Sequence, residues 1–222
     1  MKIDFPTDWK KVFKAIVKIS VYILISVVSS YYLIHFNLIV PASKIDASNF
    51  ATSILFNMPM LLLCVFLFLN ALKQEIVSFI PGFLKQARKG WQVFLLVSLG
   101  IFLAITIAKG LTLSSLYAAI YYLIFIAFSE ELAFRGFLYK ELLASLGEKR
   151  SIIISGIIFG FAHSLFGVIV FNQDLSSLFS YVVGTGIFGT LLFAFLYKKS
   201  GSLLIPIMVH SILDNMTGLS VF

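Results

Sequence analysis

Seven long apolar runs, separated by short polar stretches, dominate the pattern of hydrophobic and polar positions along the chain. Each run is close to the ~20 residues that a helix needs to cross the hydrocarbon core of a bilayer. We therefore expect an all-α membrane protein with about seven transmembrane helices. The runs lie at roughly 15–34, 51–72, 91–108, 114–134, 151–170, 178–197 and 202–219.

The stretch between the second and third runs has a different pattern. Residues 76–89 mix apolar side chains with Lys85, Arg88 and Lys89, and Pro81 and Gly82 are expected to break the helix there. This pattern predicts an amphipathic segment at the membrane interface rather than a span.

The composition excludes several protein classes. The chain is 60% apolar and 12% charged, whereas soluble domains are about 45–50% apolar and about 25% charged. A soluble enzyme, a disordered chain and a fibrous protein are therefore excluded. The single cysteine, Cys64, allows no disulfide within the chain.

The basic residues predict how the chain is oriented. Of its 17 Lys and Arg residues, 15 fall on the side where seven spans place the N-terminal segment and the second, fourth and sixth loops, with Arg135 counted just inside the helix before the fourth loop. Only Lys44 and Lys109 fall on the other side. By the positive-inside rule the N-terminus is cytoplasmic and the C-terminus external. The net charge of +7 thus reflects orientation, and we expect no nucleic-acid partner.

Ionisable residues within the predicted spans mark a candidate site, because such residues are costly in a bilayer and are functional by default. At ~1.5 Å per residue, Glu130, His163 and His210 each lie about 15–20 Å from the basic end of their own helix. They are predicted to meet near the middle of the membrane, in a site reachable from the cytoplasm. The six ionisable residues are Glu130, Glu131, Arg135, His163, His210 and Asp214.

Spacing along the first polar helix predicts separate roles for its two carboxylates. Glu131 and Arg135 are four residues apart, so they can form an ion pair on one helix face. Glu130 is rotated by ~100° from Glu131 and lacks that partner. We interpret Glu131 and Arg135 mainly as a structural clamp and Glu130 as the reactive carboxylate.

The same four-residue spacing recurs on the two histidine helices. It lets Phe159 pack against His163 and restrict its rotamers. It also lets Asp214 accept a hydrogen bond from His210 and select its tautomer. Asn215, ~100° further round the helix, is a possible donor where Asp214 is not.

Three motifs occur in order: Glu130-Glu131-Leu-Ala-Phe-Arg135 (EExxxR), Phe159-Gly-Phe-Ala-His163 (FxxxH) and His210-Ser-Ile-Leu-Asp214 (HxxxD). Over about residues 115–218 the chain resembles the CAAX protease and bacteriocin-processing (CPBP) family of intramembrane glutamate proteases, also called the abortive-infection family. The resemblance implies that Glu130 and His163 activate water, and that His210 and the residue four positions later stabilise the oxyanion. Most members have Asn at that last position. Here, either Asp214 only orients His210 or Asn215 supplies the donor.

These observations divide the chain into two parts. Residues 1–113 would form N-terminal transmembrane helices with the interfacial segment near 76–89, and residues 114–222 a CPBP-like catalytic core of four helices with the polar site inside it. The predicted function is intramembrane endopeptidase, a hydrolase acting on a membrane-associated peptide or protein without cofactor or metal. The predicted location is the bilayer of a bacterial cell membrane, as a multi-pass protein.

Other interpretations remain open at this point. Two His and two Glu could hold a metal ion, and a non-catalytic bacteriocin-immunity or regulatory protein could keep the polar site for recognition. A small transporter is disfavoured, because no inverted repeat is evident. Gly184, Gly186 and Gly189 match the dinucleotide pattern GxGxxG but lie in an apolar helix, where they, like Gly156 and Gly160, are expected to permit close helix packing.

Overall fold

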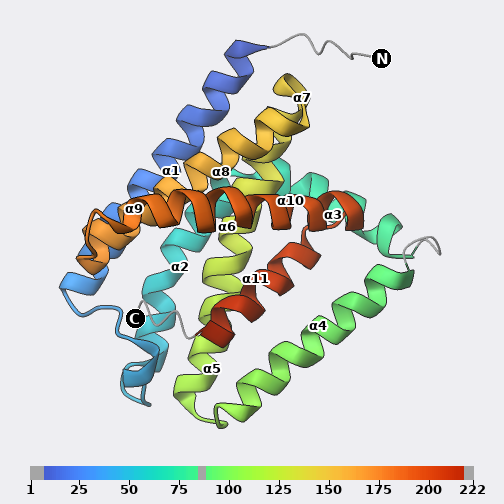
Figure 1. The fold of residues 1–222 in the computed structure, drawn as a ribbon. Coiled ribbons are helices and arrows are strands. Elements are labelled where there is room, and N and C mark those ends of the chain that lie inside the picture. Colours follow the sequence, from blue (N-terminus) through green and yellow to red (C-terminus); the bar gives the residue numbers. More distant parts are fainter. Residues whose placement is uncertain (1–7, 85–88, 218–222) are drawn as a thin grey trace.

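The structure of the protein is a computed structural model, which describes residues 8–84 and 89–217. Within these residues the chain is helical and contains no strand, as expected (Figure 1). Labels with η mark short 3-10 or π-helical segments. The elements are α1 (Trp9–His35), η1 (Ala42–Lys44), α2 (Phe50–Leu67), α3 (Leu69–Leu84), α4 (Lys89–Ala108), α5 (Leu113–Ile120), η3 (Tyr121–Phe128), α6 (Ser129–Glu131), η4 (Leu132–Tyr139), α7 (Lys140–Leu146), α8 (Glu148–Leu165), η5 (Phe166–Val170), α9 (Ser177–Ser180), η6 (Tyr181–Phe188), α10 (Gly189–Ser200) and α11 (Leu204–Thr217).

In the part of the chain that the structure describes, six helical stretches are long and apolar enough to cross a membrane, and α11 is a shorter apolar helix. The prediction of an all-α membrane protein is confirmed, but only six of the seven transmembrane helices that we expected have the required length. At ~1.5 Å per residue, the 14 residues of α11 span only ~21 Å, less than the ~30 Å hydrocarbon core. The protein is an integral membrane protein.

Local sequence signals explain several helix boundaries. The Asp8 side chain accepts a hydrogen bond from the Lys11 backbone N–H and begins α1. Thr112 and Ser115 form a capping box at the start of α5. Gly147 and Gly201 adopt positive φ values of 76° and 64° between consecutive helices, a conformation that glycine adopts without steric cost.

The segment after the second span differs from the prediction. A break at Phe68 ends α2, and α3 then continues as a helix to Leu84. The expectation that Pro81 and Gly82 break the helix is therefore wrong. The remainder of the predicted interfacial segment, residues 85–88, lies outside the described residues.

The longest rod of the fold carries the glutamate pair. Residues Leu113–Leu146 form one continuous 34-residue helical stretch, in which α5, α6 and α7 follow one another through the middle of the bundle (Figure 1). Glu130 and Glu131 lie in α6, between the π-helical segments η3 and η4. Segments of this type frequently occur at functional sites.

Glycines permit the close pairing of α8 with η6. A Cβ atom on Gly160 would lie 2.5 Å from the Val182 Cα atom, and one on Gly186 would lie 2.5 Å from the Gly156 backbone oxygen. The expectation of close packing is confirmed for Gly156, Gly160 and Gly186. It is wrong for Gly184, where an added Cβ would meet nothing within 4 Å.

Candidate functional site

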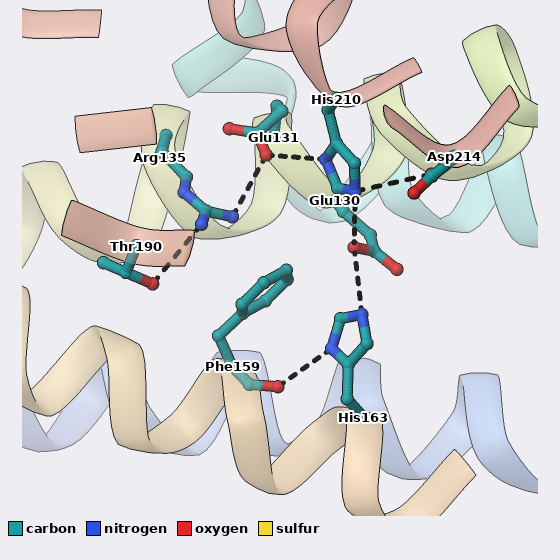
Figure 2. A network of polar contacts seen from close by, with 8 residues as sticks. All are labelled: Glu130, Glu131, Arg135, Phe159, His163, Thr190, His210 and Asp214. Atoms are coloured by element: carbon teal, nitrogen blue, oxygen red, sulfur yellow. Dashed lines mark hydrogen bonds and ion pairs between the residues drawn. The ribbon is translucent and has the colours of Figure 1, made fainter. Parts of the chain in front are cut away.

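The glutamate and the two histidines that the sequence singled out come together. Glu130 Oε2 lies 3.7 Å from His163 Nε2 and 3.8 Å from His210 Nε2. Figure 2 shows both imidazoles directed at this carboxylate, one from α8 and the other from α11. The predicted meeting of these three side chains is confirmed.

His163 is held from behind by its own helix. Its Nδ1 lies 3.1 Å from the Phe159 backbone oxygen, and a carbonyl oxygen can only accept, so Nδ1 carries the proton in the neutral ring. The Phe159 ring packs edge-on against the imidazole, with ring centroids 4.4 Å apart. The predicted contact is confirmed, and it leaves the Nε2 lone pair facing Glu130.

His210 is held by a residue from a different helix. Its Nδ1 lies 2.9 Å from Glu131 Oε1, while its Nε2 lies 3.5 Å from Asp214 Oδ2. The shorter, orienting contact that we expected from Asp214 is thus made by Glu131. Asp214 instead sits beside the nitrogen that faces Glu130.

Glu131 also pairs with Arg135, as predicted. Arg135 Nη1 lies 3.1 Å from Glu131 Oε1, and both side chains are at most 1% exposed. The Arg135 guanidinium lies between two rings, 4.3 Å from the Phe159 centroid and 4.9 Å from that of Phe193. Cation–π contacts of this kind compensate a buried charge in part.

Sequence reasoning missed Thr190 and Phe193, both on α10. Arg135 Nη2 donates to Thr190 Oγ1 at 3.3 Å, and the Phe193 ring stacks on the His210 ring with centroids 4.9 Å apart. No signal in the sequence distinguished Thr190 from Ser180 and Thr185 in the same apolar run. Phe193 carried none, because the chain has 24 Phe residues.

Asn215 is directed away from the cluster. Its Oδ1 accepts a hydrogen bond from Lys109 Nζ at 2.9 Å, and its Nδ2 donates to Thr106 Oγ1 at 3.2 Å. Lys109 also donates to the Asn215 backbone oxygen. Both partners lie at the end of α4, so the structure gives Asn215 a role in helix packing rather than that of an oxyanion donor.

A cavity of about 300 Å³ adjoins the cluster. Its wall includes the cluster residues Glu130, His163, His210 and Asp214. The Glu130 and His163 side chains are 23% and 27% exposed, so a ligand in the cavity can reach them. Glu131 and Arg135, in contrast, are fully buried behind the site.

Metal binding was the main open alternative for this cluster. Among residues 8–84 and 89–217, no group of three or more His, Cys, Asp or Glu side chains is arranged to hold a metal ion.

A comparison with protein families matches residues 112–216 to the family described as "Type II CAAX prenyl endopeptidase Rce1-like". This C-terminal part of the chain is similar to the Rce1-like family. The matched residues begin at the cap of α5 and include the whole cluster. No curated protein and no solved structure shows significant similarity to the chain. The Rce1-like match supports the protease class anticipated from the three motifs.

Proposed function

We propose that the protein is an intramembrane endopeptidase that hydrolyses a peptide bond with water activated by Glu130 and His163. The observation that carries this proposal is the convergence of His163 Nε2 and His210 Nε2 on Glu130 Oε2. Each imidazole is fixed from behind through its Nδ1. A merely structural ion pair does not need two oriented histidines around one accessible carboxylate.

The separations suit a water molecule between the groups. Distances of 3.7 and 3.8 Å are too long for direct hydrogen bonds, but a bridging water makes such contacts favourable. Glu130 and the Nε2 lone pair of His163 both accept, so a water placed there donates to each of them. In that position its oxygen lone pair is directed away from both acceptors, towards the cavity.

Hydrolysis then proceeds through a tetrahedral intermediate. The water oxygen forms a bond to the substrate carbonyl carbon as one water proton passes to Glu130. The C=O electron pair moves onto the oxygen, and His210 Nε2–H donates a hydrogen bond to this oxyanion. When the C–N bond breaks, Glu130 returns its proton to the leaving amine, so that protons and charge balance over the cycle.

The surroundings of His210 support the oxyanion role. The Glu131 carboxylate accepts the Nδ1 proton, so a proton on Nε2 is available only in the doubly protonated ring. Asp214 and Glu130 lie 3.5 and 3.8 Å from Nε2 and would favour that form. Asp214 therefore acts as a positioning residue beside the donor.

The substrate is a membrane-associated peptide or protein, and the location is a bacterial cell membrane with the N-terminus in the cytoplasm. The abundance of Phe, Ile and Lys is typical of an AT-rich bacterial genome, where prenylated substrates are not expected. Peptide leaders and pheromone precursors then become the favoured substrates. The asymmetry of the basic residues supports the orientation.

The test uses two fluorescence-quenched peptides that share one sequence, one farnesylated and the other unmodified, with purified protein in lipid nanodiscs. The proposal expects a new amine terminus in at least one product by mass spectrometry, and no product with the Glu130→Gln variant. Cleavage of the farnesylated peptide alone would assign prenyl recognition. Equal cleavage by wild type and Glu130→Gln would contradict the proposed mechanism.

A further inference from the structure

The wall of the cavity is asymmetric along the bundle. On α1 its lining residues all fall from Tyr22 onwards, and on the long rod they fall between Tyr121 and Phe134. On the next helix they run from Ala162 to Phe171, the residue that follows η5. Each of these helices therefore lines the cavity with only one part of its length.

The basic residues lie at the opposite ends of these same helices. On α1, Lys10 to Lys18 precede the first cavity residue, and on α8, Lys149 and Arg150 lie more than ten residues before Ala162. On the last pair, Tyr181 and Thr185 line the cavity near the start of η6, whereas Lys198 and Lys199 end α10. The cavity thus extends away from the basic ends on every helix that carries both.

Packed side chains close the cavity towards the basic ends of the helices. Leu138 and Leu142 follow the glutamate pair along the rod, and each is 0% exposed. Arg135 is 0% exposed and Phe159 1%, so the clamp behind the site fills the space between the histidines and the basic ends. None of the described residues that line the cavity lies beyond this layer.

We infer that the site receives its substrate from the extracytoplasmic side of the membrane. The inference rests on the proposed function and on the positive-inside orientation, and it replaces the expectation that the cytoplasm gives access to the site. The substrate class is accordingly an exported peptide, or a membrane-protein segment whose scissile bond lies in the outer half of the bilayer.

The depth of that bond follows from the helix geometry. His163 lies eight residues before Phe171, which corresponds to ~12 Å at ~1.5 Å per residue. The helix formed by α8 and η5 ends at Phe171, so the His163 side chain lies about 12 Å inside the end of this helix. A substrate segment of three or four extended residues bridges this distance at ~3.3 Å per residue.

The backbone groups of a substrate segment in a cavity of about 300 Å³ need hydrogen-bond partners within the membrane. Tyr22, Ser26 and Ser30, spaced by four residues along the lining face of α1, offer hydroxyl groups for this purpose.

Cysteine labelling in intact cells tests the direction of access. Ser30→Cys places a thiol on the cavity wall, Ala47→Cys is an exposed control in the loop after α1, and Lys149→Cys is an exposed control at a basic end. The native Cys64 is 0% exposed and gives the background. The probe is a membrane-impermeant cationic methanethiosulfonate.

We expect labelling of Ser30→Cys and Ala47→Cys in intact cells, and labelling of Lys149→Cys only after permeabilisation. Labelling of Ser30→Cys only after permeabilisation, or in neither condition, would overturn the inference, and so would reversal of the two controls. Labelling needs no catalysis. A cavity labelled from outside in a protein that cleaves no peptide would therefore refute the proposed function and leave the direction of access standing.

A vesicle assay adds the substrate. An impermeant quenched peptide supplied outside right-side-out vesicles should be cleaved, and the same peptide outside sealed inside-out vesicles should be cleaved at least tenfold more slowly. The opposite ratio would show cytoplasmic access. Detergent, which admits the peptide to both faces, should restore equal rates.

Discussion

Replacing the Glu131–Arg135 pair by apolar residues separates its structural role from its role at His210. Both side chains are at most 1% exposed, and their charged atoms are 3.1 Å apart. Removing one partner of such a buried pair costs about 3–5 kcal/mol, whereas replacing both by apolar residues is often neutral. Glu131→Leu should therefore destabilise the protein, and Glu131→Leu/Arg135→Met should recover most of the stability.

The activity should follow a different pattern. His210 loses its 2.9 Å partner in both variants, and a catalytic group displaced by about 1 Å can cost 10²-fold in rate. We expect the single and the double variant to be equally impaired, by about 10²-fold or more in kcat. The stable but inactive double variant would assign Glu131 a positioning role beyond that of a clamp.

Thermal unfolding in nanodiscs and peptide cleavage measure the two effects. For a chain of this length about 2–4 °C in Tm corresponds to 1 kcal/mol, so Glu131→Leu should lower Tm by about 6–20 °C. The control is the exposed pair Glu148–Lys198, whose charged atoms are 2.7 Å apart and whose replacement by Glu148→Leu/Lys198→Met should cost at most ~1 kcal/mol. A double clamp variant with wild-type activity would refute the reasoning.

Three further predictions follow from the site and its packing. Gly160→Ala should lower both Tm and activity, because the added Cβ would lie 2.5 Å from the Val182 Cα atom. The control variant Gly184→Ala, with open space around the added Cβ, should match wild type. Equal Tm values for the two variants would contradict the packing argument. His210→Ala should reduce kcat by ~10²–10³-fold through loss of an oxyanion donor. Asp214→Asn should keep substantial activity, because Glu130 and Glu131 still flank the His210 ring; if both variants are equally inactive, the two glutamates do not suffice and the charge of Asp214 is essential. Activity should survive exhaustive chelation, and inactivation that added zinc reverses would make Glu130, His163 and His210 metal ligands.

Contacts along one helix were predictable from the sequence, and contacts between helices were not. The four-residue spacing correctly paired Glu131 with Arg135 and Phe159 with His163, because both contacts follow from helix geometry alone. The partner of His210 Nδ1 comes from a helix 79 residues earlier. Spacing suggested Asp214 for that position because the rotation of α11 against the rod is a tertiary property.

For the fold as well, local features were predictable from the sequence and the packing between helices was not. Apolar runs predicted the long helices, since length and hydropathy are local properties. The direction in which the cavity opens depends on how several helices pack against one another. No single run of residues in the sequence determines that packing. Asn215 seemed suited to the oxyanion from its place on α11, but the end of α4 engages its side chain through Thr106 and Lys109.

The rate of peptide cleavage by Glu130→Gln, compared with Glu148→Gln, tests the central claim most directly. Glu130 Oε2 is the oxygen on which both histidines converge, whereas Glu148 is an exposed carboxylate paired with Lys198. Because an amide cannot take a proton from water, Glu130→Gln should lose 10²–10⁴-fold in kcat, with Tm close to wild type and Glu148→Gln unimpaired. A folded Glu130→Gln protein that cleaves the peptide at the wild-type rate would contradict the assignment of Glu130 as the general base.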